Sequence, residues 1–473
     1  MEDYKKSTGD LLVEFFSEEV PARMQFQSGV HLEESFKKEF DKRDIRYGEI
    51  EILTGPRHLA IIIKQLDLKQ QDQIIEKRGP RFDANEKALN GFLNSNDIDL
   101  KDTEIKDTKN GKFHFYIKKI KGLDTKKIIP EIIHEITYGF VWSKSQRWGS
   151  TDLRWARPLR NILLLLNDEV VEGELELGNS EVIKFSNYTY GHRHYDKKIK
   201  IDHISHYKKI LIQNHVILNR DDRKYKISND MEVLLTKNKL SLLDDLLLLE
   251  EVTGLVEFPN VMLGSISNEF MSLPPEVLST AMKVHQKYFS TIDHQNNLAP
   301  NFIFVANSLT DTKRDATVVE GNERVLKARL SDANFFWRSD LSKSFEYWND
   351  KLRKVAFYEG LGSVYDKTLR MSKISNFVSK AFNVNPSLAS QTALLSKADL
   401  ASEMVGEFPE LQGVMGGYYS DLIGYQKEIS KAITEHYKPR GALDSIPKTN
   451  IGGMLSIIDK IDTLTCFFVI GKK

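Results

Sequence analysis

The hydrophobic pattern of the chain changes near Val318. Beyond this position, apolar residues recur at helical spacing, interrupted at short segments that contain glycine or proline. Before it, alternating patterns typical of strands are interleaved with helical ones. A sheet has to bury its apolar face against another layer, and helices are the usual cover. The sequence therefore predicts an α+β fold, with two mixed modules of sheet and helix followed by an all-helical domain.

The length of the chain requires more than one domain. Domains usually contain about 100–200 residues, so a chain of 473 residues is expected to form about three. The predicted domains are an N-terminal α+β domain over residues 1–155, a second α+β module over residues 156–340 and a helical domain over residues 341–473.

The charge balance narrows the classes of function. Lysine plus arginine and aspartate plus glutamate both number 67, so the formal net charge is zero. This excludes a strongly basic nucleic-acid binder as a description of the whole chain, but it allows a local basic face. The only cysteine, Cys466, cannot form an intrachain disulfide and fits a reducing compartment. Because no segment approaches the roughly 20 apolar residues of a membrane span and the start lacks a signal-peptide pattern, we expect a cytoplasmic protein without membrane contact.

Local patterns predict the elements of the two mixed modules. Pro21 suits a first helical turn, and a helix is expected from there to Phe40. Two strands are expected around Ile50–Ile52 and Leu59–Ile63. Further expected elements are a half-buried strand over 113–117, a helix over 128–136, strand and turn over 182–194, a helix from about 201 to 239, a strand over 255–263 with Pro259 at an edge or bulge, a helix from 273 and a strand over 301–306.

The chain lacks the common nucleotide-binding motifs. It has neither a Gly-x-x-x-x-Gly-Lys-Ser/Thr phosphate loop nor a dinucleotide-binding glycine fingerprint. Gly413–Gly417 is interpreted as a break between loop and helix. Residues Arg370–Lys373 resemble the mobile Lys-Met-Ser-Lys-Ser loop of class I aminoacyl-tRNA synthetases, but apolar neighbours at helical spacing place them on an amphipathic helix. The His-x-Gly-His partner of that loop is also missing.

Two pairs of histidines have spacings that suit metal binding. His192 and His194 would share one side of a strand, and His203 and His206 one side of a helix, with Asp202 as a further candidate ligand. Zinc needs three or four ligands in tetrahedral geometry. Nothing in the sequence brings the two pairs together, so surface or hydrogen-bonded histidines are favoured and no metal ligand is assigned.

The segment Trp142–Arg160 interleaves three tryptophans with five basic residues. Rings that stack on bases and guanidinium groups that bind phosphates are what RNA contact requires. The same composition also builds an aromatic core whose arginines pair with acids. The core is the favoured interpretation of this segment, and the RNA contact stays open.

Acidic residues at a spacing of about sixty mark the helical region. Asp399 and Asp459 resemble two metal-binding aspartates of the HD phosphohydrolase superfamily, whose metal lowers the pKa of a bound water. This chain has Lys397-Ala398 where that family has His-Asp. A degenerate, structural HD-like bundle is therefore favoured over an active hydrolase that uses Asp399, His436 and Asp459.

Several motifs occur together and in one order along the chain. They are Leu11–Glu14, Ser17–Ala22, Thr54–Arg57, Lys144–Trp148, Arg157–Arg160, Gly191–Arg193, Val252–Glu257, Leu273–Leu278, His285–Phe289, Glu320–Leu326, Lys397–Leu400 and Glu403–Gly413. Each is weak alone, but together they resemble one family, the β subunit of the bacterial heterotetrameric glycyl-tRNA synthetase, over nearly the whole chain.

The resemblance implies a division of labour between two subunits. The α subunit carries the catalytic site and binds glycine, ATP and Mg, whereas the β subunit binds tRNA(Gly) and docks on α in an α2β2 assembly. It also implies that the middle module is similar to the editing-type module of the phenylalanyl-tRNA synthetase β subunit. Family members continue after the position of Ile470-Gly471 into further helices and a C-terminal anticodon-binding domain, which is absent from this sequence, so we expect a fragment or a shortened gene product.

The leading hypothesis is that the chain positions tRNA for glycine attachment without carrying a catalytic residue, cofactor site or metal ligand of its own. Clustered cations would contact phosphates, although each can equally pair with an acid, and the segment Glu320–Leu330 can equally contact the α subunit. The candidates are Arg147, Arg157, Arg160, Arg324, Lys327 and Arg329. The alternatives are the metal-dependent phosphohydrolase and a non-enzymatic scaffold held to partners by an apolar helix stripe with Phe336 and Trp337.

Overall fold

The computed structural model describes residues 7–442 and 444–472, without the side chains of Gln73 and Lys119. About 48% of the chain is helical and 22% is in strands, which confirms the predicted α+β class with a helical C-terminal region. The chain divides into two compact units. Unit 1 comprises Met1–Asn229, Leu249–Asn260 and Ala306–Leu309, and unit 2 comprises Asp230–Leu248, Val261–Val305 and Thr310–Lys473.

Unit 1 is built on a seven-stranded sheet with the order β2-β3-β1-β7-β10-β9, in which β8 pairs with β7. The strands are β1 (Thr8–Ser17), β2 (Ile50–Thr54), β3 (His58–Asp67), β7 (Leu159–Leu166), β8 (Glu169–Val170), β9 (Glu174–Gly178) and β10 (Glu181–Ser186). All neighbours are antiparallel except β10 and β7. The predicted strands around 50–52 and 59–63 are confirmed.

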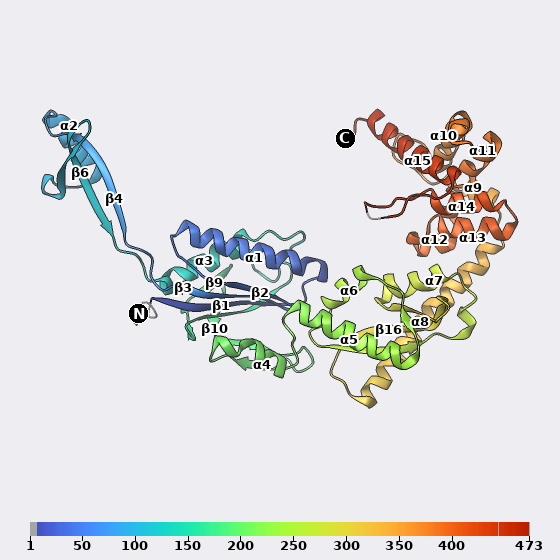
Figure 1. The fold of residues 1–473 in the computed structure, drawn as a ribbon, viewed down its shortest axis with the longest axis horizontal. Helices are drawn as coiled ribbons and strands as arrows, with labels where there is room; N and C mark the ends of the chain where they lie inside the picture. The colour runs from blue at the N-terminus through green and yellow to red at the C-terminus, as the bar shows by residue number, and fades with distance from the viewer. Residues whose placement is uncertain (1–6, 443, 473) are drawn as a thin grey trace. The chain divides into compact units, whose positions relative to one another are not determined.

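Helices cover both faces of this sheet because its central strands are apolar on both sides. On one face, Leu11, Val13 and Phe15 of β1 pack with α1 (Ala22–Lys42) and α3 (Thr125–Gly139). On the other face, Leu12 packs with α4 (Tyr207–Gln213). Figure 1 shows α1 and α3 on one side of the sheet and α4 on the other. The predicted helices over 21–40 and 128–136 are confirmed.

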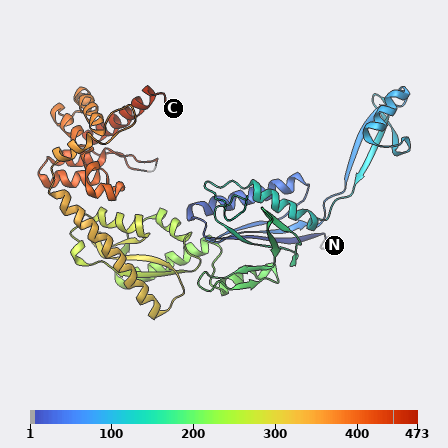
Figure 2. The same cartoon turned by 180° about the vertical axis from the view of Figure 1, so that it is seen from behind.

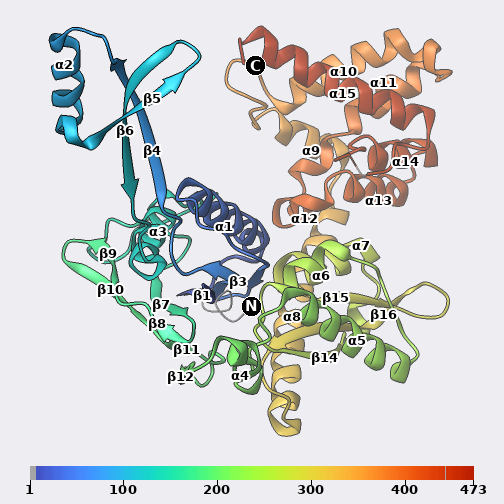
Figure 3. The same cartoon turned by 60° about the vertical axis from the view of Figure 1, so that its left-hand side comes forward.

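A second sheet in unit 1 has the order β4-β6-β5. It consists of β4 (Gln73–Arg81), β5 (Thr103–Thr108) and β6 (Gly111–Ile120), and α2 (Glu86–Asn96) lies beside it (Figure 3). Phe113 and Phe115 are buried as the alternating pattern predicts. His114 is buried as well, because its ring lies against Phe82 and its Nδ1 contacts the Thr103 hydroxyl at 3.3 Å.

The long helix expected over 201–239 is interrupted, so this prediction is wrong between residues 214 and 219. The segment forms η3 (Ile204–His206), α4 and α5 (Arg220–Asn238). His215 takes a left-handed backbone conformation, and the Ile217 N–H donates to the Glu257 carbonyl instead of to a helical neighbour. The hairpin of β11 (Tyr188–Tyr190) and β12 (Lys198–Lys200) confirms strand and turn in the preceding segment.

The middle of the chain contains a four-stranded sheet with the order β13-β15-β16-β14. Its strands and neighbouring helices are β13 (Ser241–Leu242), α6 (Leu246–Thr253), β14 (Pro259–Ser265), η4 (Asn268–Phe270), α7 (Pro275–Thr280), η5 (Ala281–His285), β15 (Phe289–Ile292) and β16 (Leu298–Asn307). Pro259 opens β14 at the edge of the sheet, as its missing N–H predicts.

The remaining part of unit 2 is helical. Its elements are α8 (Thr312–Leu341), α9 (Phe345–Leu352), α10 (Val364–Val378), η6 (Ser379–Phe382), α11 (Pro386–Leu395), η7 (Ala398–Ala401), α12 (Glu403–Glu407), η8 (Pro409–Leu411), α13 (Val414–Ile423), α14 (Lys427–Glu435) and α15 (Asn450–Val469). Figure 2 shows α8 as one uninterrupted helix. Met371, Ala393, Ala432 and Met454 are at the centre of the core that joins α10, α11, α14 and α15.

Helix α8 starts earlier than the apolar pattern suggests. Asp311 caps it by accepting hydrogen bonds from the N–H groups of Lys313 and Arg314. Leu326 and Leu330 are buried, as apolar residues at helical spacing predict, but Val325 in the same helix is 45% exposed. No helix in the described ranges is long and apolar enough to cross a membrane.

Candidate functional site

Several motifs that carry the family resemblance contain or contact a group of buried polar side chains at the large sheet of unit 1. Glu14 lies on β1 among apolar residues and is fully buried. Its carboxylate accepts hydrogen bonds from the Thr189 hydroxyl at 2.6 Å and from the Tyr207 hydroxyl, and contacts His58 Nδ1 at 3.0 Å. Burial, together with the adjacent Glu14 carboxylate, raises the pKa of Tyr207 well above its ordinary value. Tyr207 is therefore a neutral donor to Glu14.

Arg57 and Glu257 form a buried bidentate ion pair next to this group. The Arg57 Nε and Nη2 atoms donate to the two carboxylate oxygens at 2.7 and 3.0 Å, and Nη2 also donates to the Gly191 carbonyl at 2.7 Å. Glu257 also accepts from the Arg193 N–H. Burial acts to raise the pKa of Glu257, but the hydrogen bonds and charge of Arg57 outweigh it and lower that pKa. The pair thus joins the segments that carry Thr54–Arg57, Gly191–Arg193 and Val252–Glu257.

Arg223 of α5 is fully buried, and its hydrogen bonds go to backbone carbonyls. Its guanidinium donates to the carbonyls of Thr54, Ile217, Leu218 and Thr253 at 2.7–3.2 Å. Burial lowers the pKa of Arg223 to about 10. A charge that binds four backbone carbonyls fixes the ends of β2 and α6 and the segment before α5 rather than a substrate.

Glu14 and Glu257 lie in the motifs that carry the resemblance, but the sequence assigns no role to them or to His58 and Arg223. Glu14 stands in the apolar run Leu11–Phe16, and a charge in a run that must be buried is the signal that could have found it. Arg223 gives no such signal, because the surrounding helix is polar.

The three basic candidates in unit 1 are placed at or near its surface. The Arg160 guanidinium is 38% exposed, lies over the rings of Phe16 and Tyr190, and has Glu18 at 3.3 Å and Asp196 at 3.8 Å. Arg157 is half-buried and donates to the Ala156 carbonyl at 2.8 Å. Arg147 is 59% exposed with Asp152 at 3.6 Å.

The tryptophans of the same segment belong to the core. Trp155 is 1% exposed and packs against Phe15, Phe140 and Trp142, with ring centroids 4.9–5.5 Å apart. Trp148 packs against the same core. The aromatic-core interpretation is confirmed for these rings, and a base cannot stack on Trp155. The surrounding arginines remain accessible at the surface.

The three basic candidates in unit 2 lie on α8. Arg324 and Lys327 line a cavity of about 240 Å³ with Ser265, Ser267 and Phe270. Lys327 Nζ lies 3.8 Å from Glu269, and within the described residues no ion pair is formed by Arg324. Arg329 points elsewhere, with Nη1 3.5 Å from Glu407 of α12. The structure therefore brings two of the three together.

A buried ionic cluster surrounds Asp459, one of the two aspartates that resemble HD metal ligands in the sequence. The two oxygens of Asp459 bind the ammonium groups of Lys367 at 2.8 Å and Lys397 at 2.6 Å. Burial opposes the charge on Asp459, yet the two ammonium groups hold the pKa of that carboxyl well below its usual range. Burial lowers the pKa of Lys397 to about 8. Lysine ammonium groups thus supply the positive charge that a metal would supply in an HD site.

The other proposed metal ligands are used differently. Asp399 accepts from the N–H groups of Gly413 at 2.6 Å and Gly416 at 2.9 Å, and burial raises its pKa to about 6. The His436 Nδ1 contacts the Ile433 carbonyl at 2.6 Å, and burial lowers the pKa of His436 well below its ordinary value. Across residues 7–442 and 444–472, no three His, Cys, Asp or Glu side chains are arranged to hold a metal ion. The geometry disfavours the phosphohydrolase alternative.

The remaining motifs are accounted for by the fold. Arg370–Lys373 lies within α10, as predicted, and Arg370 binds Asp462 through two hydrogen bonds of 2.8 and 3.0 Å. Gly413 precedes α13 with φ 81°, which confirms the break there, but Gly416 and Gly417 lie inside the helix. The His192 Nε2 contacts Asn307 at 2.9 Å and the His203 Nδ1 contacts Asp168 at 2.9 Å, which are hydrogen-bonded arrangements.

Comparison with known proteins adds the family. The model of a family described as the glycyl-tRNA synthetase beta subunit matches residues 11–473. The relatives include proteins named glycine–tRNA ligase beta subunit from Rickettsia bellii (strain OSU 85-389), 39% identical over 464 residues, and from Rhodospirillum centenum (strain ATCC 51521 / SW), 36% identical over 488 residues. Each alignment covers 98% of this chain and 68% of the relative.

The family model and these relatives define one class, the aminoacyl-tRNA synthetases. The chain belongs to the family of glycyl-tRNA synthetase β subunits. The resemblance based on the motifs is thereby confirmed over nearly the whole chain.

Proposed function

We propose that this chain binds and positions tRNA(Gly) for ATP-dependent glycylation and docks a catalytic α subunit, in an α2β2 assembly in the cytoplasm. The observation that carries the proposal is the match of residues 11–473 to the β-subunit family. Orientation is the chemical contribution of such a subunit, because holding the acceptor end within attack distance removes several kcal/mol of barrier. ATP and Mg are proposed to bind the α subunit, where the adenylate forms.

The basic candidates are proposed to contact tRNA phosphates or the α subunit. Arg160 supports this role because its guanidinium is held over two aromatic rings while remaining partly exposed. Its acids, Glu18 and Asp196, are also partly exposed, and exposed ion pairs contribute only about 0–1 kcal/mol. A phosphate can therefore replace them at small cost.

The finer assignments of domains remain part of the proposal. The N-terminal domain over 1–155, the editing-type module over 156–340 and the HD-like domain over 341–473 are proposed as the functional divisions. Glycine is the smallest amino acid, so a tight pocket on the α subunit excludes larger ones by clash, and editing by this chain is not required.

The test combines this chain with the α subunit and measures glycyl-tRNA formation and tRNA binding as a function of salt. We expect tRNA binding at low salt that weakens as salt rises, and glycylation only when both subunits are present. Binding no tighter than that of a neutral control protein at low salt would refute the positioning role.

The first double variant tests Arg157 and Arg160, which lie just before and within the start of β7. We expect R157A/R160A to reduce the slope of log binding constant against log salt by about 1 for each phosphate that the variant no longer binds. The matched control is R46A/R81A, two exposed arginines of the same unit. An equal change of slope in the control would show that general charge, and not this surface, binds tRNA.

A further inference from the structure

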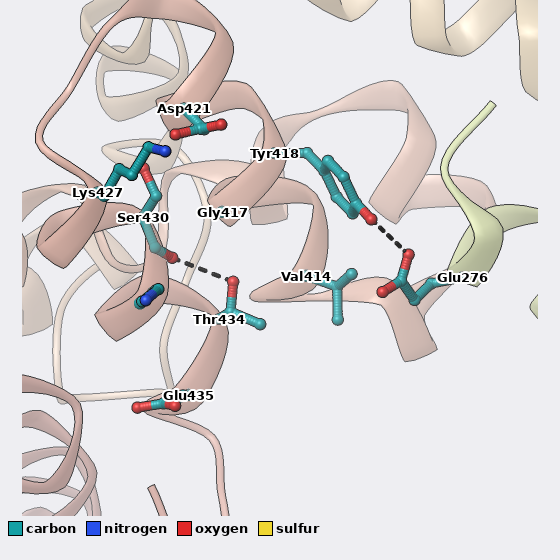
Figure 4. A pocket seen from close by; sticks show the side chains of 10 residues that line it. Glu276, Val414, Gly417, Tyr418, Asp421, Lys427, Ser430, Thr434 and Glu435 are labelled. Atoms are coloured by element: carbon teal, nitrogen blue, oxygen red, sulfur yellow. Dashed lines mark hydrogen bonds between the residues drawn. The ribbon is translucent and has the colours of Figure 1, made fainter. Parts of the chain in front are cut away.

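A cavity of about 360 Å³ lies between α13 and α14 in unit 2 (Figure 4). Its volume falls in the range of small-molecule sites, about 300–1,000 Å³. The lining residues are Glu276, Val414, Gly417, Tyr418, Asp421, Lys427, Ser430, Lys431, Thr434 and Glu435. The cavity is distinct from the ionic cluster around Asp459 and from the six basic candidates, since none of those residues lines it.

Gly417 determines how closely the two helices approach at this cavity. A Cβ atom at this position would lie 2.0 Å from the Thr434 hydroxyl oxygen and 3.0 Å from the Ser430 carbonyl. The missing side chain of Gly417 therefore allows α13 and α14 to pack closely at the floor of the cavity. Longer side chains on both helices form the walls of the cavity. Figure 4 shows Lys427 and Tyr418 on opposite sides of the cavity, with Gly417 between them.

Two of the three acids around the cavity are already bound. Glu276 accepts a hydrogen bond from the Tyr418 hydroxyl at 2.7 Å. Glu435 accepts from the N–H groups of Lys448 and Thr449 and from the Thr449 hydroxyl at 2.8–3.1 Å. Asp421 is exposed and is the acid left to meet a ligand.

The cations around the cavity are accessible to a ligand. Lys427 and Lys431 are exposed and stand one turn apart on α14, so their side chains point to the same side. Within the part of the chain that the structure describes, neither forms an ion pair. The two ammonium groups on this wall can both donate hydrogen bonds to the oxygens of one phosphate, so the attraction belongs to this wall and not to the whole cavity, whose lining also carries three carboxylates.

The opposite wall offers an aromatic surface. Tyr418 is fixed by its hydrogen bond to Glu276 and by an edge contact with Trp337, with ring centroids 6.4 Å apart. Val414 adds an apolar surface on the same helix. A ligand that fits both walls carries a flat ring at one end and a phosphate at the other.

We propose that this cavity binds a nucleoside 5′-monophosphate group, with the phosphate at Lys427 and Lys431 and the base at Tyr418. Asp421 accepts a hydrogen bond from a ribose hydroxyl or an exocyclic amine of the base. The group belongs either to a free mononucleotide or to an unpaired nucleotide of tRNA, and the second source rests on the function proposed above.

The test is equilibrium dialysis of labelled AMP against the purified full chain. We expect saturable binding, and an affinity at least about tenfold lower in K427M/K431M, because no ammonium group then binds the phosphate. The matched control is K373M/K380M, two exposed lysines of the same helical region outside the cavity. Adenosine and inorganic phosphate are each expected to bind more weakly than AMP.

Two further measurements make the outcome decisive. V414W fills the cavity without changing its charge and is expected to abolish AMP binding, while circular dichroism verifies that each variant is folded. Competition by tRNA that disappears on removal of its 3′-terminal adenosine assigns the site to that nucleotide, and absence of competition assigns the site to a free mononucleotide. No saturable AMP binding, or equal AMP affinity in K427M/K431M and wild type, overturns the proposal, and neither result bears on tRNA binding elsewhere.

Discussion

At the scale of the residue, a buried ion pair explains the structural role of two motifs that this chain shares with its family. Arg57 and Glu257 are 3% and 1% exposed at their side chains, so neither can be hydrated if its partner is removed. The pair connects segments that are 200 positions apart in the chain. Their role is to hold the loops of unit 1 in one arrangement.

Replacing one partner of this pair is expected to be costly. E257Q should lower the free energy of unfolding by about 3–5 kcal/mol, because Arg57 loses its buried partner and keeps only the exposed Asp196, 3.8 Å away. The control E18Q removes the exposed partner of Arg160 and should cost about 0–1 kcal/mol. Urea unfolding followed by circular dichroism measures both, and similar losses of stability in the two variants would contradict the account.

Asp399 gives a prediction that depends on pH. Burial raises its pKa from 3.8 to about 6, so the folded state binds a proton more tightly than the unfolded state. The stabilisation is complete below pH 3.8 and is lost as pH rises to 6. Relative to D399N, wild type should therefore lose about 2.5 kcal/mol of stability between pH 4 and pH 7. Urea unfolding at several pH values measures this difference, and parallel profiles would contradict the raised pKa.

At the scale of the element, close helix contacts are a testable feature. G417A on α13 places a methyl group 2.0 Å from the Thr434 hydroxyl and should cost about 1–3 kcal/mol through overpacking against α14. Gly321 in α8 has open space around its Cβ position, so G321A should instead gain up to about 1 kcal/mol from helix propensity. Thermal unfolding of the two variants compares them, and a stabilised G417A would show that the helices move apart freely.

The elements that sequence could predict are those whose pattern is local. The helix from Pro21, the strands of β2 and β3 and the helical C-terminal region follow from period and turn chemistry within a few residues. The break at 214–219 could not be predicted, because it depends on a hydrogen bond from Ile217 to Glu257, forty positions away. The helical position of Gly416 and Gly417 could not be predicted for the same reason, since their glycines are explained by close packing against distant residues, Asp399 and Ile433 for Gly416 and Thr434 for Gly417.

Some features of the candidate site could likewise be predicted from local sequence, and others could not. The exposure of Arg147 and Arg160 could be predicted, because arginine side chains are rarely buried unless they are paired. This exposure agrees with a role at the surface. The neutralisation of Asp459 by Lys367 and Lys397 could not be predicted, since the two lysines are 92 and 62 positions from it in the chain. The cavity between α13 and α14 has no motif at all and follows only from the approach of the helices.

At the scale of the whole molecule, the absence of net charge makes local cations responsible for any salt dependence of tRNA binding. Arg324 and Lys327 on α8 are cations of unit 2 that share a cavity, and that helix is also a candidate contact for the α subunit. The two roles predict different effects of one variant. If both side chains bind phosphate, R324A/K327A should reduce the salt slope of tRNA binding by about 2 and leave co-elution with the α subunit unchanged.

If α8 instead docks the α subunit, R324A/K327A should weaken co-elution and leave the salt slope of tRNA binding to the isolated chain unchanged. The matched control is R314A/K313A at the first turn of the same helix, outside the cavity. Size-exclusion chromatography with the α subunit and tRNA binding measured at several salt concentrations separate the two roles. Unchanged values in both assays would remove α8 from either interface, because two exposed cations cannot support an interaction that their removal does not weaken.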